Sequence, residues 1–287
     1  MSVLFRQLTI CGVGLIGGSL ALDVRRRGLV ERIVGFGRTQ ANLDIALRRG
    51  IIDIGTLDPV EAARDADLVM LATPVMNFPA TLKAMVTYLP PNAVVTDVGS
   101  VKAWVVDQLE PLLGPAMSFV GVHPVAGREL AGAAAAEERL FENRWVIVTP
   151  SKRSEPEALN KVETIWRATG ARVERMAPAV HDAILARASH LPQIVASALA
   201  TALADESVGG YWAAGFGAGG LRDTTRIAAS SPEMWRDICL TNRDALVQAL
   251  ALYRDWFARF ERAVTAGDSH ALSDLFERGR QMRRRIA

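Results

Sequence analysis

Histidines are the first residues to consider as catalytic groups, because an imidazole exchanges a proton near neutral pH. The chain has four of them: His123, His181, His190 and His270. His123 directly follows the apolar run 119–122 and precedes Pro124, so we expect it at the end of a strand. At that edge of an α/β sheet, a histidine beside a nicotinamide can accept a hydroxyl proton while a hydride leaves the same carbon. A histidine that only caps a strand turn is the alternative interpretation.

His190 lies inside a predicted helix, directly before Leu191 and Pro192. A proline within a helix frees backbone carbonyl groups and bends the axis, so this segment could line a cleft. The position of His190 fits a ligand-binding residue and a buried core histidine equally well. For His181 and His270 we expect a location at the surface or at a domain boundary, without a functional role.

Arg226 stands at the start of a predicted apolar helix, where an unpaired guanidinium would be costly. It could bind a substrate carboxylate through two parallel hydrogen bonds. An ion pair with Asp223 or Asp237 explains the same arginine equally well. No group of His, Cys and Asp residues has the spacing of a metal site, and we therefore predict no metal.

A glycine-rich run follows the first apolar segment, where Gly12, Gly14 and Gly17 form a G-x-G-x-x-G pattern between a predicted strand and a predicted helix. In this context the pattern indicates a dinucleotide site. Gly12 permits the tight turn, Gly14 lets the backbone approach a pyrophosphate, and Gly17 lets the helix pack on the strand. The N–H groups of Leu15 and Ile16, in the first turn of that helix, would face the pyrophosphate. A glycine-rich turn without a ligand is the alternative.

The end of the second predicted strand should distinguish the two nicotinamide cofactors. An NAD site places Asp or Glu there, to bond the ribose 2′-hydroxyl. This chain has Arg38 and Thr39 instead, which suit the 2′-phosphate of NADP, so we predict NADP. Arg38 stacked on the adenine would allow NAD to bind as well. Thr73 and Ser100 follow two further predicted strands, and both should face the cofactor edge unless they only end those strands.

Short apolar runs rich in β-branched residues should form the sheet that positions these groups. They alternate with helical patterns, which predicts an α/β fold of the Rossmann type, with a doubly wound, mostly parallel sheet. The runs cover residues 7–10, 32–36, 67–72, 93–97, 118–122, 144–148 and 171–176, and helical patterns cover 15–27, 42–49 and 78–89.

The second half of the chain shows no further strand pattern, and we predict a separate all-α domain there. The boundary should lie near Pro178, with a dinucleotide-binding domain over residues 1–178 and a helical domain over residues 179–287. Within the helical domain we expect a long helix over 179–206, bent or restarted at Pro192. A flexible glycine-rich loop over 209–220 and helices over 224–266 and 269–286 should follow.

Composition narrows the class of protein. Half of the 287 residues are hydrophobic, which excludes a disordered chain. The 33 Lys and Arg nearly balance the 31 Asp and Glu, and a net charge of +2 predicts no bulk attraction to nucleic acid or to a membrane. The chain has two cysteines and no apolar run of about 18 residues, which predicts a soluble protein of the reducing cytoplasm.

Five segments, in this order along the chain, together resemble the prephenate/arogenate (cyclohexadienyl) dehydrogenase family of tyrosine biosynthesis. They are residues 12–19, 97–102, 123–132, 189–192 and 226–237, which span nearly the whole chain. The resemblance implies an oxidative decarboxylation of prephenate, arogenate or both, in which a hydride passes to the nicotinamide, carbon dioxide leaves and the ring becomes aromatic. It also implies a homodimer formed through the helical domain.

The resemblance assigns catalytic and binding roles to the matched residues. His123 corresponds to the family's catalytic histidine, hydrogen-bonded to the ring hydroxyl, and Ser100 to a serine beside the same hydroxyl. His190 and Arg226 correspond to residues that hold the substrate, with Arg226 on a carboxylate.

Three more substrate-binding positions follow from the resemblance. Glu129 corresponds to a glutamate that orders or gates the site, and Trp235 to a residue that lines the substrate region. Many relatives carry a histidine where this chain has Gln193. An amide there changes the hydrogen bonding offered to the substrate side chain, whose keto or amino form separates prephenate from arogenate, and is compatible with arogenate or dual use.

Two other classes of protein share parts of this pattern. A two-domain dehydrogenase of the β-hydroxyacid type would use a catalytic lysine in its helical domain, whereas residues 179–287 contain no lysine. A non-catalytic NADP-sensing protein would keep the glycine run but would not need His123, Ser100, His190 and Arg226 together.

Overall fold

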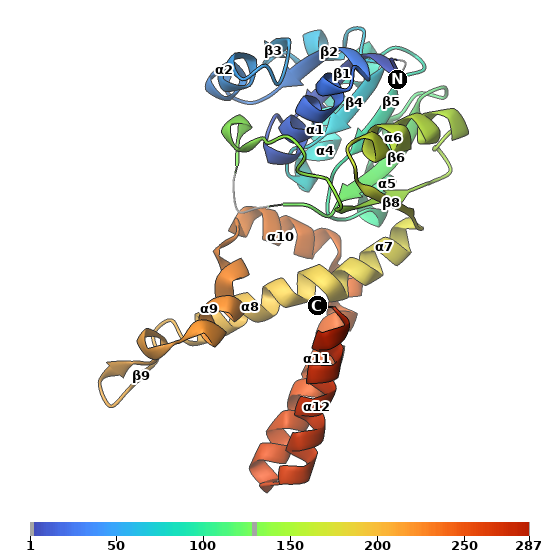
Figure 1. Ribbon diagram of the computed structural model, residues 1–287. Coiled ribbons are helices and arrows are strands. Elements are labelled where there is room, and N and C mark those ends of the chain that lie inside the picture. The colour runs from blue at the N-terminus through green and yellow to red at the C-terminus, as the bar shows by residue number, and fades with distance from the viewer. Residues whose placement is uncertain (1–2, 128–130, 287) are drawn as a thin grey trace. The chain divides into compact units, whose positions relative to one another are not determined.

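The computed structural model describes residues 3–127 and 131–286 (Figure 1). Its central element is an eight-stranded sheet with the strand order β3-β2-β1-β4-β5-β6-β7-β8. The strands are β1 (Phe5–Cys11), β2 (Val30–Phe36), β3 (Ile54–Thr56), β4 (Leu68–Leu71), β5 (Val94–Asp97), β6 (Ser118–Pro124), β7 (Trp145–Thr149) and β8 (Arg172–Arg175). The predicted Rossmann-type, mostly parallel sheet is confirmed.

Helices cover both faces of the sheet, because its strands are apolar on both sides. In β1, Leu8 and Ile10 pack into one buried cluster and Cys11 into the other, since successive side chains of a strand point to opposite faces. The helices of the first cluster are α1 (Leu15–Arg26), α2 (Gln40–Arg48) and α6 (Pro156–Ala168). Those of the second are α3 (Pro59–Ala63), α4 (Phe78–Met85) and α5 (Ala103–Leu109).

The chain reverses its direction of travel across the sheet between β1 and β4. Strand β1 pairs in parallel with β2 on one side and with β4 on the other. In open parallel sheets, ligands bind beyond the carboxyl ends of the strands at such a reversal. Because β4, β5 and β6 are also parallel, Gly12, Thr73, Ser100 and His123 all lie toward this edge.

One strand runs against its neighbour. Strand β7 pairs antiparallel with β6, with Ile147 opposite His123, and β8 then pairs parallel with β7. A strand buried on both faces reads the same in either direction, so the apolar run 144–148 could not reveal this. The described residues between β6 and β7 form only a short 3₁₀ turn, η4 (Ala133–Ala135), instead of the crossover helix that a parallel connection needs. The three-residue strand β3 is likewise absent from the sequence prediction.

Beyond β8 the chain continues mainly as helices. These are α7 (Pro178–Leu185), a π-helical turn η5 (Ala186–His190), α8 (Leu191–Ala202), α9 (Gly219–Thr225), a 3₁₀ turn η7 (Arg226–Ala229) and α10 (Pro232–Thr241). The expected irregularity near Pro192 is the π turn just before it. Pro192 itself lies in the first turn of α8, where a missing N–H is tolerated.

One prediction for this region is wrong. Residues 209–220 are not one flexible loop, because strand β10 (Tyr211–Trp212) pairs with β9 (Ser207–Val208) and a 3₁₀ turn follows. Residues 224–266 are mainly helical, as predicted, but they form several helices, because Ser231 caps a new helix by accepting a hydrogen bond from the Met234 N–H. Pro232, next in sequence, has no N–H with which to continue the preceding turn.

The chain divides into two compact units between Asn242 and Arg243, so that α7 to α10 belong with the sheet. The second unit consists of two helices, α11 (Arg243–Ala266) and α12 (Ser269–Arg285). A tight turn joins them, with Gly267 at a φ of 64° and the Asp268 side chain accepting a hydrogen bond from the first turn of α12. No helix in the described part of the chain has both the length and the hydropathy to cross a membrane.

Candidate active site

The turn between β1 and α1 has the conformation that the glycine run predicts. Gly12 has a φ of 99°, which favours glycine, and its N–H donates a hydrogen bond to the Phe36 carbonyl at 2.8 Å. A Cβ on Gly12 would lie 2.8 Å from the Ala72 carbonyl oxygen and 2.9 Å from the Thr73 nitrogen. The turn is therefore pressed against the chain that leaves β4, and Thr73 lies beside it.

Gly14 and Gly17 differ in what surrounds them. A Cβ on Gly17 would lie 2.8 Å from the Gly12 carbonyl oxygen, so this glycine lets α1 approach the turn closely. No protein atom lies within 4 Å of a Cβ on Gly14. Because no side chain caps α1, the N–H groups of Leu15 and Ile16 at its start remain for an anion. Open space in front of a helix N-terminus fits the pyrophosphate of a dinucleotide.

The end of β2 carries the two residues predicted to select the cofactor. Arg38 and Thr39 are both exposed, and the Thr39 hydroxyl makes no cap hydrogen bond although it stands at the N-cap of α2. Thr73, beyond β4, is half-buried, with its hydroxyl 3.5 Å from the Pro74 carbonyl oxygen. A guanidinium and an uncommitted hydroxyl at the end of β2 are thus accessible to a ribose substituent.

His123 belongs to a chain of hydrogen bonds that runs into α7. It lies in β6 with 8% of its surface exposed, and its Nδ1 is 2.8 Å from His181 Nε2. Nδ1 of His181 is in turn 2.7 Å from Oδ1 of Asp182. His181 is fully buried, so it is not a surface residue; it lies in the first turn of α7, close to the predicted domain boundary at Pro178. It is buried because the first turn of α7 packs against the start of α5.

The start of α5 holds the Asp182 carboxylate. The Lys102 N–H donates to its Oδ1 at 2.8 Å and the Ala103 N–H to its Oδ2 at 2.9 Å. The Lys102 side chain is fully buried; its ammonium pairs with the Asp97 carboxylate and donates to the Val122 carbonyl at 2.8 Å. Asp97 also accepts a hydrogen bond from the Val122 N–H. The buried ion pair therefore ties β5 to β6 beside His123, and the main-chain N–H of the same lysine ties them to α7.

Burial keeps the histidines of this site neutral. Desolvation lowers the pKa of His123 well below 6.5, and the neighbouring His181, Lys102 and His190 lower it further. Burial also lowers the pKa of His181, against the opposing effect of the Asp182 carboxylate. It lowers the pKa of His190 to about 4. Near neutral pH, His123 is therefore a neutral imidazole, with a proton on one ring nitrogen and a lone pair on the other.

His190 is fully buried in the π turn η5. Its Nδ1 lies 3.1 Å from the side-chain nitrogen of Asn242, which also donates to the Asp182 carbonyl at 2.9 Å. Within the part of the chain that the structure describes, neither His190 Nε2 nor the Trp235 indole nitrogen has a hydrogen bond of normal geometry. The two rings meet edge to face with centroids 6.0 Å apart. The Trp235 indole nitrogen is the clearer case, because a hydrogen bond with the Ser100 backbone raises the pKa of His190. A buried polar atom without a partner is uncommon and indicates a place for a polar ligand.

Gln193 supports the turn that carries Arg226. Its Nε2 donates to the Ile227 carbonyl at 2.9 Å. Arg226 is exposed in the 3₁₀ turn η7 rather than in a helix start. Asp237, one of its two alternative ion-pair partners, is bound by Arg236 at 2.6 Å. Gln193 therefore acts on the backbone beside Arg226.

The structure brings Ser100, His123 and His190 to one place. Ser100 is half-buried beyond β5, and its backbone raises the pKa of His190. His190 in turn lowers the pKa of His123. Glu129 lies outside the described residues. No group of three or more His, Cys, Asp and Glu side chains among the described residues is placed to bind a metal.

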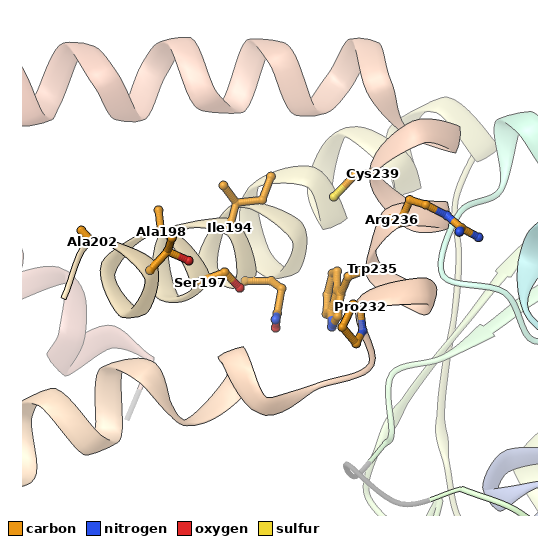
Figure 2. Close-up of a pocket in the computed structure, with 10 residues that line it drawn as sticks. Ile194, Ser197, Ala198, Ala202, Pro232, Trp235, Arg236 and Cys239 are labelled. Atoms are coloured by element: carbon orange, nitrogen blue, oxygen red, sulfur yellow. The ribbon is translucent and has the colours of Figure 1, made fainter. Parts of the chain in front are cut away.

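A groove of about 620 Å³ lies between α8 and α10. Figure 2 shows Ile194 and Ser197 on α8 beside Trp235 on α10. The lining is mostly apolar and includes neither His123 nor Arg226. The groove is therefore not by itself the binding place of a polar substrate.

The buried polar residues around His123 were not predicted from the sequence. They are Asp97, Lys102, His181, Asp182 and Asn242. One signal was available in the sequence, because His181 and Asp182 are adjacent polar residues in the otherwise apolar stretch 177–185. Such a pair at a helix start is buried only if each member finds a partner.

Comparison with known proteins gives matches over the whole chain. The family model of the prephenate dehydrogenase nucleotide-binding domain matches residues 20–175, and that of the prephenate dehydrogenase dimerization domain matches residues 177–278. Prephenate dehydrogenase of Bacillus subtilis is 34% identical over 270 residues, which cover 94% of this chain and 72% of the relative. Cyclohexadienyl dehydrogenase of Zymomonas mobilis is 32% identical over 285 residues, which cover 97% and 95%.

A solved structure matches the chain from end to end. Prephenate dehydrogenase from A. aeolicus, in complex with hydroxyphenyl propionate and NAD+, has a TM-score of 0.94 and 34% sequence identity. The match covers 100% of both chains.

Alanine substitutions at Gly14 and Gly17 should separate cofactor binding from stability. Gly17→Ala brings a methyl group 2.8 Å from a backbone oxygen, so the free energy of unfolding should fall by about 1–3 kcal/mol. Gly14→Ala meets no protein atom, so its thermal unfolding should match that of the wild type. Its cofactor Kd should rise roughly tenfold or more, because the methyl group occupies the space of the pyrophosphate. Thermal melts measure the stability of both variants, and fluorescence titration measures their cofactor Kd. Wild-type cofactor affinity in Gly14→Ala would contradict the proposed pyrophosphate site.

Proposed function

The chain belongs to the prephenate dehydrogenase family, and we propose that His123 is the base of its reaction and NADP its preferred oxidant. The reaction is the oxidative decarboxylation of prephenate or arogenate in tyrosine biosynthesis. Its product is 4-hydroxyphenylpyruvate from prephenate and tyrosine from arogenate. Gly12, Gly14 and the N–H groups at the start of α1 would hold the dinucleotide through its pyrophosphate, and its nicotinamide would supply the acceptor for the hydride that leaves the ring carbon.

The balance of protons in this reaction defines what the base must do. Loss of the hydride and of the hydroxyl proton turns the hydroxyl-bearing carbon into a carbonyl. The electron pair of the broken carbon–carboxylate bond then enters the ring, carbon dioxide leaves, and the carbonyl becomes a phenolate. The phenolate takes one proton. The base therefore takes a proton from the substrate and can return the same proton to the product.

The free ring nitrogen of His123 is the observation that carries this assignment. Its Nδ1 is engaged by His181, whereas its Nε2 makes no hydrogen bond within the described residues. A pKa well below 6.5 keeps that nitrogen unprotonated near neutral pH. His123 also lies at the ligand edge of the sheet, in the strand next to β5. Such a nitrogen can accept the hydroxyl proton and later give it to the phenolate.

The residues around His190 provide donors for the substrate. The Asn242 side-chain nitrogen faces Nδ1 of His190, so the proton of the neutral ring belongs on Nε2, which becomes a donor. The indole N–H of Trp235 is a second donor without a protein partner among the described residues. We assign both to polar groups of the bound substrate. The Ser100 hydroxyl would bond the ring hydroxyl beside His123.

Arg226 and Gln193 would select the substrate at its other end. The Arg226 guanidinium would bind a carboxylate with two hydrogen bonds, on a turn held by the Gln193 amide. An amide accepts and donates, so it accommodates the keto side chain of prephenate and the amino side chain of arogenate. We therefore propose that both substrates are used. Glu129 would order this region, by its correspondence to the family's glutamate.

The preference for NADP rests on the end of β2. Arg38 and Thr39 are exposed there, and no carboxylate stands among residues 35–39. An arginine pairs with a 2′-phosphate, whereas selection of NAD uses an acidic acceptor for the 2′-hydroxyl.

We further propose that residues 1–178 bind the dinucleotide and that residues 179–287 bind the substrate and form a homodimer. The match of residues 177–278 to a dimerization-domain model supports this division. So does a set of apolar side chains around the β9–β10 hairpin that are 55% to 75% exposed: Val208, Tyr211, Trp212 and Phe216. Exposed apolar groups gathered in one segment mark interaction surfaces.

Replacement of His123 should remove the proton acceptor and leave substrate binding largely intact. His123→Asn should lower kcat by about 10²- to 10⁴-fold, with KM close to wild type. In the wild type, kcat/KM should stay level from neutral pH to below 6.5 and then fall, because acid protonates Nε2 of His123 as the pH drops through its lowered pKa. Initial rates followed by absorbance of the reduced nicotinamide measure both. A wild-type kcat in His123→Asn would remove the residue from this role.

Replacement of Arg226 should act mainly on substrate binding. Arg226→Ala should raise KM for prephenate roughly 10- to 100-fold, because a lost charged hydrogen bond costs about 1.5–3 kcal/mol. Arg226→Lys keeps the charge but not the two-pronged geometry, so its KM should lie between the two. Steady-state kinetics of the pair provide the test, and an unchanged KM in Arg226→Ala would exclude the carboxylate contact.

Replacement of Arg38 should change the choice of cofactor. Assays of prephenate and arogenate with NAD and with NADP should show higher kcat/KM with NADP in the wild type, and the reverse in Arg38→Asp, because a carboxylate repels the 2′-phosphate. Arg48→Asp makes the same change of charge at the other end of α2, where the side chain is also exposed, and should leave the ratio unaltered. Equal ratios in Arg38→Asp and the wild type would show that the 2′-position is recognised elsewhere.

A further inference from the structure

We propose that His181 and Asp182 form a relay with His123, which fixes the resting proton of His123 on Nδ1 and stabilises the charge that His123 carries during the reaction. The proposal rests on the assignment of His123 as the base, and goes beyond it by naming two positioning residues on α7. Neither residue has to touch the substrate.

The Asp182 carboxylate determines which nitrogen carries the proton in both rings. A carboxylate only accepts hydrogen bonds, so Nδ1 of His181 must donate to it. Nε2 of the neutral His181 is then a lone pair, which accepts a hydrogen bond from Nδ1 of His123. The lone pair of His123 is left on Nε2, the atom without a hydrogen bond within the described residues. If the protons were on the other ring nitrogens, Nε2 of His123 would already carry a hydrogen and could not accept one from the substrate.

Asp182 is suited to this role because other groups hold it in place. The Lys102 and Ala103 N–H groups bond one carboxylate oxygen each, at 2.8 Å and 2.9 Å. With His181, three N–H donors therefore converge on a carboxylate that is 5% exposed. The two backbone donors cannot reverse their role, because backbone N–H groups never accept, and a carboxylate oxygen that only accepts requires His181 Nδ1 to donate. The order of protons in the two histidines is thus set by the main chain of α5.

The relay also stabilises the positive charge that His123 acquires during the reaction. When Nε2 accepts the substrate's proton, His123 becomes a cation at a buried place. The titratable and charged groups that face it are His181, Asp182, His190 and Lys102 with its partner Asp97. Burial, Lys102 and His190 disfavour the cation. A charged His181 would disfavour it too, whereas the neutral His181 accepts the hydrogen bond of His123 Nδ1. Asp182, linked through His181, is the carboxylate whose charge is directed at Nδ1 of His123.

The proton balance of the step is closed. The substrate O–H bond breaks and an N–H bond forms on Nε2 of His123, while its Nδ1–H strengthens its hydrogen bond to His181. The Nδ1–H of His181 does the same toward Asp182. When the phenolate takes the proton from Nε2, both hydrogen bonds return to their resting state. The relay therefore neither consumes nor releases a proton over one turnover.

The resting arrangement can be tested on the wild-type protein. In protein labelled with ¹⁵N in histidine, NMR distinguishes protonated from unprotonated ring nitrogens, and His123→Asn identifies the His123 signals. We expect His123 and His181 to be protonated on Nδ1 near neutral pH. Protonation of His123 on Nε2 would overturn the proposal.

Variants of the two positioning residues test the effect on the reaction. In Asp182→Asn the amide nitrogen replaces one carboxylate oxygen and faces a backbone N–H; in the place of Oδ1 it would donate to His181 Nδ1 and reverse both tautomers. We expect its kcat to fall about 10²- to 10⁴-fold, with KM near wild type and the His123 proton moved to Nε2 in the NMR spectrum. If Asp182→Asn fails to fold, because Asp182 also holds the start of α5, the His181 variants and the wild-type spectrum decide.

His181→Gln and His181→Leu form a matched pair. The glutamine oxygen can take the place of Nε2 and accept from His123, whereas leucine fills similar space without an acceptor. We expect kcat to fall much further in His181→Leu than in His181→Gln, with cofactor affinity unchanged in both. Equal, wild-type kcat in the two variants would exclude the relay, while an inactive His123→Asn would still support the base. Activity in His123→Asn would instead refute the proposed function itself.

Discussion

The Asp182 carboxylate is the point on which the arrangement of the site depends. It receives hydrogen bonds from the main chain at the start of α5 and from the His181 ring, and so joins the sheet domain to the first helix beyond it. Both links are buried, so water cannot substitute for either partner. The helical part that carries His190 therefore takes its position from the strand end that precedes α5. The same carboxylate therefore fixes the position of His190 relative to His123.

The buried ion pair of Asp97 and Lys102 lies next to this connection between the sheet and α7. A fully buried ammonium is costly unless charge and hydrogen bonds satisfy it, and here a carboxylate and the Val122 carbonyl do so. The same ammonium lowers the pKa of His123, which keeps that imidazole neutral. One buried cation thus fastens β5 to β6 and, together with desolvation, favours the neutral form of His123. The two effects share one cause, the low dielectric of the interior.

The sequence predicted the features that depend on local pattern. Gly12 needs a positive φ and a strand buried on both faces needs an unbroken apolar run, so the glycine turn and most of the sheet were foreseen. The antiparallel direction of β7 could not be predicted, because an apolar run has the same pattern whichever way the strand runs in the sheet. The burial of His181 could not be predicted either, because it depends on α5, some 80 positions away from Asp182. Local composition cannot report a partner so distant along the chain. The turn at Arg226 was read as helix because its apolar spacing continues through Ser231 and Pro232, where the helix in fact restarts.

The hydrogen bond from Gln193 to the Ile227 carbonyl has a consequence for how the enzyme responds to its surroundings. A carboxamide carries no charge at any pH that a cell experiences, so the support of the arginine's turn is the same in acid and in alkali. An imidazole in that place would gain a charge on acidification, and the strength of its hydrogen bond to the carbonyl would change. The hydrogen bond that supports the Arg226 turn is therefore insensitive to acidity, in contrast to the buried imidazole of His123, whose protonation changes with pH.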